Sequence, residues 1–169
     1  MESLIVTNAH KIVKGSYPDL SRVDKDFFFM NRPNIAQCAE TVTDLYVNRL
    51  PKAYGYNSTD DIQIICPSKK GETGTININK ILQNLLNPPS ELKQEIIVAG
   101  QIFREGDKVM QTKNNYNVNW ESNEEMGTGI FNGDIGILKK VDPKSNVVTI
   151  DFDGRETVIP GEYLSELEL

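Results

Sequence analysis

Tight-turn signals in the last third of the chain restrict that region to short, closely spaced antiparallel strands. Asn132-Gly133, the run 143–146 and Asp153-Gly154 separate segments in which apolar and polar residues alternate. An Asp-Gly pair between two such segments favours a two-residue hairpin, since both turn positions then take positive φ. Close-set strands with tight turns are typical of a small antiparallel β-barrel. Strands are predicted over about 107–112, 134–140, 147–152 and 155–159, with a long polar loop over 117–130.

The first hundred residues show helical spacing of their apolar residues instead. Ser3 is a suitable N-cap for a first helix and Gly15 a suitable stop, while Pro51 and Gly55 are expected to close a second helix. Asn87-Pro88-Pro89 is expected to end a third helix. Helices are therefore predicted over 4–14, 34–50 and 76–86.

Two continuous apolar runs lie between these helices. Residues 27–30 read Phe-Phe-Phe-Met, and residues 62–66 read Ile-Gln-Ile-Ile-Cys before a proline. Short apolar runs of this kind favour buried strands. Strand, helix, strand, loop and helix in this order are typical of an α/β layered domain. We expect that domain to meet the barrel near residues 98–103.

Composition sets few limits on partners. The chain of 169 residues carries a formal net charge of -6, whereas dedicated nucleic-acid binders are usually basic; local patches can still bind DNA. No apolar run approaches the roughly 18 residues of a membrane span, and no secretory signal is recognised. Cys38 and Cys66 are isolated, as in proteins of a reducing compartment. We expect a cytoplasmic protein without membrane contact.

Signatures of catalysis are missing from the sequence. It has no Walker A pattern, no GxSxG and no Cys–His pair. His10 is the only histidine, and a lone helical histidine is more often structural than catalytic. Asp151 and Asp153 flank a turn, which explains them better than metal binding. No catalytic residue and no metal site are expected in these residues.

The loop "PSKKGETGT", residues 67–75, precedes the third predicted helix. A loop at a helix N-terminus presents backbone N–H groups that favour anions such as phosphate. Lys69 and Lys70 add positive charge, and Thr73 and Thr75 can cap the helix or donate to a phosphate. The alternative is an ordinary capped helix start with two surface lysines.

The stretch "NNYNVNW", residues 114–120, combines asparagines with aromatic residues. Tyr116 and Trp120 have faces for base stacking, and asparagines can contact phosphates or base edges. The alternative is a solvent-exposed loop with its aromatic residues packed on the barrel.

Together these segments resemble consecutive blocks of RecD-type superfamily 1 DNA helicases, the family of the exodeoxyribonuclease V alpha subunit. The proline–GxxGT loop combined with the Phe-Asn-Gly-Asp-x-Gly turn is specific to it; Ser68 and Val13 depart mildly, standing where the family commonly has Met and Asn. The matching stretches are "ESLIVTNAHKIVKG" (2–15), "PSKKGETGTININKILQNLLNP" (67–88), "FREGDKVMQTKNNY…GIFNGDIGIL" (103–138) and the terminal "DFDGRETVIPGEYLSELEL".

The resemblance implies a fold of two parts. Residues 1–100 would be a partial second RecA-like motor domain, of the α/β class. Residues 101–165 would be an inserted small antiparallel β-barrel of the Src-homology-3 type, and residues 166–169 a return towards the motor domain. The Walker A lysine, the Walker B acid and the final motor motifs have no counterpart in this chain.

The resemblance also implies a function. The intact parent would be an ATP-dependent 5′-3′ DNA helicase in recombination and repair, with ATP and Mg²⁺ as cofactors. This chain would be a fragment that is inactive alone and holds no cofactor. Its partners would be single-stranded DNA, the remaining helicase domains and subunits of a nuclease complex. The DNA-binding residues would be Asn8, His10, Lys70, Thr73, Gly74, Thr75, Asn114, Asn115 and Tyr116.

A second function class stays open on the residues. Small barrels often bind peptides through aromatic grooves. In that case the barrel would dock a helicase partner subunit, and Trp120 and Phe131 would matter more than the asparagines.

Overall fold

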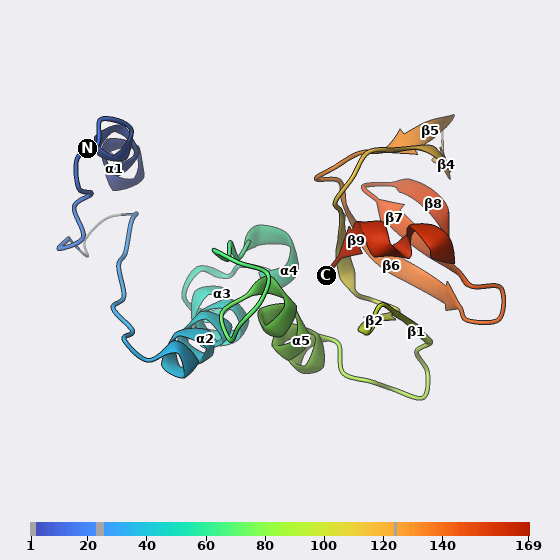
Figure 1. Cartoon of the computed structure of the whole chain (residues 1–169), viewed down its shortest axis with the longest axis horizontal. Coiled ribbons are helices and arrows are strands. Elements are labelled where there is room, and N and C mark those ends of the chain that lie inside the picture. Colours follow the sequence, from blue (N-terminus) through green and yellow to red (C-terminus); the bar gives the residue numbers. More distant parts are fainter. Residues whose placement is uncertain (1–2, 23–25, 124) are drawn as a thin grey trace. The chain divides into compact units, whose positions relative to one another are not determined.

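The computed structural model describes residues 3–22, 26–123 and 125–169. Its contacts divide the chain into two compact units, residues 1–38 and 39–169. Helices and extended segments occupy the chain up to about residue 94, and the strands follow from Glu95 onwards (Figure 1). None of the described helices is both long enough and apolar enough to cross a membrane.

The first unit contains helix α1 (Leu4–Val13), as predicted. The Ser3 hydroxyl accepts a hydrogen bond from the Val6 N–H, which confirms the N-cap, and Gly15 takes a φ of 73° after the helix. Asp26 also accepts from the Ser3 hydroxyl at 2.5 Å and from the Leu4 N–H at 2.8 Å. These two hydrogen bonds, the hydroxyl first, lower the pKa of Asp26.

A second helical run covers the predicted helix 34–50 but ends later. Leu50 donates its N–H to the Leu45 carbonyl, so a π-type turn precedes Pro51. Pro51 then lies in the first turn of the next helix, where its missing N–H has no partner to lose. The expected stop at Pro51 is therefore wrong, and the run ends before Gly55. Its pieces are α2 (Ile35–Asp44), η1 (Leu45–Arg49) and α3 (Leu50–Tyr54), followed by the short α4 (Ser58–Asp61).

The two buried strands expected at 27–30 and 62–66 do not form, and this part of the prediction is wrong. Phe28 and Phe29 are about half exposed, at 52% and 51%. Residues 62–66 are extended and alternate between half-buried and exposed, but they pair with no strand in the described part of the chain. An apolar run becomes a strand only where a second strand accepts its backbone hydrogen bonds. The α/β layer is thus not seen as a sheet.

Helix α5 (Thr75–Leu86) confirms the third predicted helix. It buries Ile78 and Leu82 against Ala39 and Tyr46. Ile62, Ile64 and Cys66 pack on this cluster from the extended segment. The helical spacing of Ile78, Ile81, Leu82 and Leu85 predicts that these residues share one apolar face, and this holds except for Leu85, which is 55% exposed.

The strands form a curled half-barrel of mostly antiparallel β-structure (Figure 1). The main sheet has the order β5-β4-β8-β7-β6-β3-β9, and β1 and β2 form a separate hairpin. Ile150, Phe152 and Leu138 are completely buried in the core. The strands are β1 (Glu95–Val98), β2 (Gln101–Arg104), β3 (Lys108–Gln111), β4 (Asn115–Glu121), β5 (Met126–Ile130), β6 (Ile135–Asp142), β7 (Val147–Phe152), β8 (Arg155–Pro160) and β9 (Leu167–Glu168), with the 3-10 helix η2 (Gly161–Glu166) before β9.

The four strands predicted from the turn signals are confirmed as β3, β6, β7 and β8. Asp153 and Gly154 have φ angles of 54° and 83°, as the predicted hairpin between β7 and β8 requires. The polar loop expected over 117–130 is wrong, because β4 and β5 form a hairpin there. Val118 is buried while Asn117 and Asn119 are exposed, so the strand alternates despite its asparagines.

Buried polar groups join α5 to the half-barrel. The carboxylate of Asp107 accepts from the Arg104 N–H at 2.7 Å, from Gln83 at 2.6 Å and from Asn87 at 2.7 Å. Burial raises the pKa of Asp107, although these hydrogen bonds oppose the shift. Arg104 lies beside it and binds Glu95 and the Asn87 carbonyl. The helix and the strands therefore form one structural unit.

Candidate nucleic-acid interface

The loop before α5 uses its own carbonyls to satisfy the first N–H groups of the helix. Thr75 N–H donates to the Ser68 carbonyl at 3.1 Å, and Ile76 N–H donates to the Lys69 carbonyl at 3.2 Å. Gly74 lies so close to the loop that an added Cβ would meet the Lys69 and Lys70 carbonyl oxygens at 2.6 Å. The fold therefore requires glycine at position 74. Two of the backbone donors expected to face a phosphate are already bonded.

A carboxylate of the same chain lies at the start of α5. The Thr75 hydroxyl donates to Glu168 Oε1 at 2.6 Å, and Lys69 Nζ is 3.3 Å from Glu168 Oε2. Lys70 is exposed and Thr73 is half-buried. An anion thus occupies the helix N-terminus, as the loop chemistry favours, but it comes from β9. Lys70 and Thr73 remain the accessible predicted contacts of this loop.

An exposed aromatic pair marks the junction of β3, β4 and β5. The rings of Tyr116 and Phe131 meet edge to face, with centroids 5.8 Å apart, and are 66% and 41% exposed. Asn114 lies beside the pair: its amide approaches the Tyr116 hydroxyl at 3.4 Å, and its oxygen accepts from the Asn132 N–H at 2.9 Å. The junction offers an exposed aromatic surface with amide groups beside it.

Asn115 uses its side chain within the fold. It is buried, its amide donates to Glu166 Oε2 at 3.0 Å, and its oxygen accepts from the Asn117 N–H at 3.1 Å. Gln111 donates to the same Glu166 oxygen at 3.1 Å. Asn115 thus ties the start of β4 to the end of η2.

The segment from Glu166 to Glu168 connects the two candidate loops. Glu166 binds Asn115 at the junction of β3 and β4, and two residues later Glu168 binds Thr75 at the start of α5. Two residues of extended chain span about 7 Å. This short segment therefore contacts both the start of β4 and the start of α5. Neither acidic residue was recognised from the sequence, since only its contacts in the fold give it this role.

Asn8 and His10 belong to the unit formed by residues 1–38. Asn8 is buried, and its amide accepts from the Asp19 N–H at 2.7 Å and donates to the Asp19 carbonyl at 3.0 Å. Its side chain therefore holds the loop after α1. His10 is exposed on the last turn of α1.

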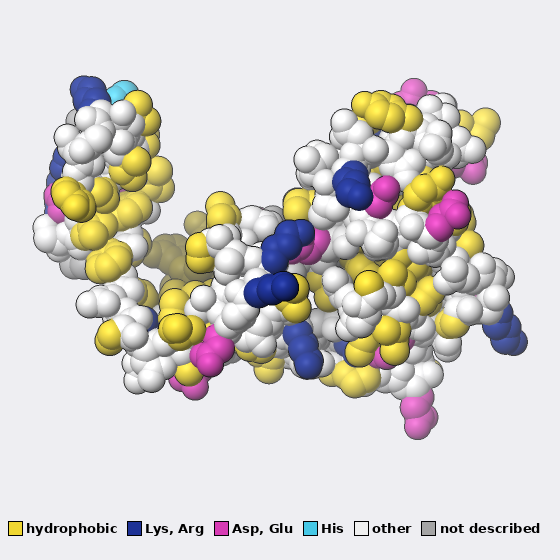
Figure 2. All heavy atoms as spheres, viewed as in Figure 1, with side chains coloured by type: hydrophobic (Ala, Val, Ile, Leu, Met, Phe, Trp, Pro, Cys, Tyr) yellow, Lys and Arg dark blue, Asp and Glu magenta, His cyan; other side chains and the backbone are white. Residues whose placement is uncertain are grey.

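The surface charge is mixed. On the face shown in Figure 2, Lys and Arg side chains lie singly or in small groups among acidic and uncharged side chains. A broad basic surface of the kind that carries electrostatic DNA binding is not visible there. Any contact with a nucleic acid on this face depends on local groups such as the aromatic pair.

The curled half-barrel is consistent with an SH3-like domain, and comparison with known proteins gives similarities in the same region. Residues 78–152 match the family model described as the ATP-dependent RecD-like DNA helicase SH3 domain. The match begins inside α5, in agreement with the packing of that helix on the strands. The ATP-dependent RecD2 DNA helicase of Deinococcus radiodurans is 36% identical over 108 residues. That alignment covers 64% of this chain and 13% of the helicase, so the chain spans a small part of its curated relative.

Proposed function

We propose that this chain works as part of an ATP-dependent 5′-3′ DNA helicase of the RecD type and contributes contacts to single-stranded DNA. The observation that carries the proposal is the exposed pair of Tyr116 and Phe131, with Asn114 beside it, in a region that matches the model of the helicase SH3 domain. Exposed aromatic rings stack with bases of any sequence, which suits a protein that moves along a strand.

In this proposal the strand crosses both candidate loops. Bases stack on Tyr116 and Phe131, and phosphates are bound by Lys70, Thr73 and the start of α5. The contacts of Glu166 with Asn115 and of Glu168 with Thr75 support this path, because one short segment reaches both candidate loops. Asn115 and Gly74 shape the two loops, and Asn8 and His10 belong to a further contact region.

The remainder of the motor lies in other parts of the parent protein. Residues 1–100 belong to its second RecA-like domain, 101–165 to the inserted barrel and 166–169 to the return. ATP and Mg²⁺ would be bound by the remaining domains. The parent acts in DNA recombination and repair, alone or with nuclease-complex subunits.

Fluorescence anisotropy of a labelled oligothymidine against the 169-residue chain tests the DNA contact. The single strand is titrated across a salt series with duplex as the comparison. Replacing Tyr116 and Phe131 by leucine keeps an apolar side chain but removes the stacking face. Base stacking contributes about 1–3 kcal/mol per base, so the double variant is expected to bind at least about tenfold more weakly.

Tyr17→Leu is the matched control, because Tyr17 is 94% exposed and lies in the other unit. Its affinity is expected to equal that of the parent chain. Equal affinity of the double variant, with its circular dichroism unchanged, would remove the aromatic pair from the DNA path.

A second candidate function is supported by a different surface. The half-barrel carries a groove beside Trp120 and Tyr163, lined in part by acidic side chains. In this role the barrel docks a partner protein of the helicase.

A further inference from the structure

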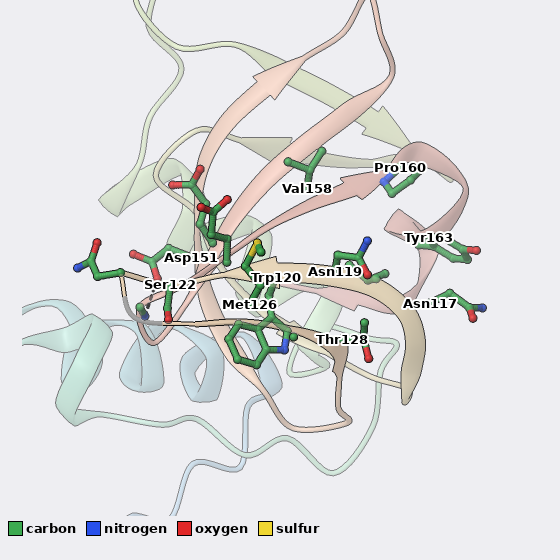
Figure 3. A pocket seen from close by; sticks show the side chains of 16 residues that line it. Asn117, Asn119, Trp120, Ser122, Met126, Thr128, Asp151, Val158, Pro160 and Tyr163 are labelled. Carbon is green, nitrogen blue, oxygen red and sulfur yellow. Dashed lines mark hydrogen bonds between the residues drawn. The ribbon is translucent and has the colours of Figure 1, made fainter.

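A groove of about 1150 Å³ runs along the hairpin of β4 and β5 and the neighbouring β8. Figure 3 shows Asp151 and Ser122 at one end of it and Asn117, Pro160 and Tyr163 at the other. The groove is separate from the aromatic pair, since neither Tyr116 nor Phe131 lines it. It has a volume sufficient for several residues of an extended peptide.

One end of the groove is acidic because three carboxylates lie in register. Glu121 on β4 is paired with Glu156 on β8, and Glu156 is paired with Asp151 on β7. Like charges directly opposite each other in a sheet are destabilising. Lys139 Nζ lies 3.6 Å from Asp151, but the described residues provide no ion pair for Glu121 or Glu156. No lysine or arginine lines the groove.

The rest of the groove is apolar and amide-rich. Met126 and Val158 are 79% and 55% exposed. Pro160 and Tyr163 lie at the end away from the acidic row (Figure 3). Glu156 and Pro160 are four positions apart on β8, a distance of about 13 Å in a strand. An extended segment of about four to five residues therefore reaches from one end to the other.

We propose that this groove binds an extended peptide segment of a partner protein, with arginine or lysine at the acidic end and aliphatic or proline residues at the other. Charge complementarity selects this occupant. A cationic side chain between Glu121 and Glu156 replaces their repulsion by attraction, and desolvated apolar contacts follow along Val158 and Pro160. The phosphates of DNA would be repelled by the same row. The proposal is independent of the DNA contact at Tyr116.

The probe is the synthetic peptide Arg-Lys-Arg-Pro-Leu-Pro, and its charge-reversed match is Glu-Asp-Glu-Pro-Leu-Pro. Binding to the 169-residue chain is followed by amide chemical shifts. The cationic peptide is expected to shift the amides of Glu121, Met126, Glu156 and Val158 most, and the acidic peptide to shift none of them. Shifts spread over other surfaces, or no shifts, would overturn the proposal.

The variant Glu121→Gln/Glu156→Gln removes two exposed charges without changing side-chain size. Exposed ion pairs contribute a few tenths to 1 kcal/mol each, so the cationic peptide is expected to bind about fivefold more weakly. Glu40→Gln/Glu91→Gln is the matched control, since both residues are exposed and lie outside the groove. If both variants weaken peptide binding equally, the effect comes from the net charge of the chain, and the proposed site is wrong. If oligothymidine shifts the amides of the groove, the groove binds DNA and not a peptide.

Discussion

The carboxylate of Glu168 accepts a 2.6 Å hydrogen bond from the hydroxyl of Thr75, which lies 93 residues earlier in the chain. Lys69 completes the contact at 3.3 Å. The side chains expected to bind phosphate at the start of α5 are therefore already engaged by a negative group. A phosphate that approaches this helix must displace the Glu168 carboxylate or bind beside it.

Glu168→Gln is expected to strengthen binding of single-stranded DNA by about threefold at low salt. The amide keeps an acceptor for Thr75 but removes the negative charge that repels phosphate, an effect of a few tenths to 1 kcal/mol at a partly exposed site. Anisotropy titrations measure it, with Glu91→Gln as the control. A Glu168→Gln affinity equal to that of the parent at low salt would mean that no phosphate is bound at this helix.

Asp107→Ala is expected to lower the free energy of unfolding by about 2–4 kcal/mol. The change leaves the Arg104 N–H, Gln83 and Asn87 without their shared acceptor in a buried place, and such unsatisfied groups are costly. Urea denaturation followed by circular dichroism measures the loss. Asp153→Asn, at an exposed turn position that tolerates either residue, is expected to change stability little.

The raised pKa of Asp107 gives the fold a specific pH dependence. Burial raises this pKa above its ordinary 3.8, so the unfolded chain releases the proton at lower pH than the folded chain. The contribution of Asp107 to stability is therefore fully present below pH 3.8 and is lost as the pH rises through the folded-state pKa.

Comparing denaturation of the parent chain with that of Asp107→Asn over this pH range isolates the effect from other carboxylates. As the pH increases, the parent chain is expected to lose stability relative to Asp107→Asn. A difference that stays constant with pH would contradict the raised pKa.

Gly127→Ala is expected to destabilise the β4–β5 hairpin by about 1–3 kcal/mol, the usual range for an added methyl group in a packed place. Gly127 is paired with Trp120 across the hairpin, and a Cβ there would meet the indole ring. Trp120 is the only tryptophan, so its fluorescence reports the change directly. Ser165→Ala is the control, because Ser165 is exposed and lies on η2, outside the hairpin. An unchanged emission maximum and unfolding midpoint in Gly127→Ala would show that the ring does not lie on Gly127.

The sequence predicts this fold best where the pattern is local. The Asp153-Gly154 turn and the alternation around it determine β7 and β8 without help from distant residues. Strand β4 was missed because asparagine is depleted in strands, although Val118 and its neighbours alternate correctly. Residues 62–66 were read as a strand because an apolar run reveals burial but does not reveal whether a pairing strand is present.

The candidate site was predictable only in part for the same reason. The composition of residues 114–120 identified Asn114 and Tyr116, which are accessible, and Asn115, whose amide is used within the fold. The family resemblance added Asn8, whose amide is also used within the fold. Glu166 and Glu168 gave no signal because their roles depend on contacts across 51 and 93 residues. Side chains that act over such separations are recognised only once the chain has folded.

The pairing of β9 with β3 closes a long loop of chain. Met110 and Glu168 are partners in that pairing, so the 57 residues between them leave and return at one place. A segment whose two ends lie side by side can be carried by a larger protein without separating the elements on either side of it.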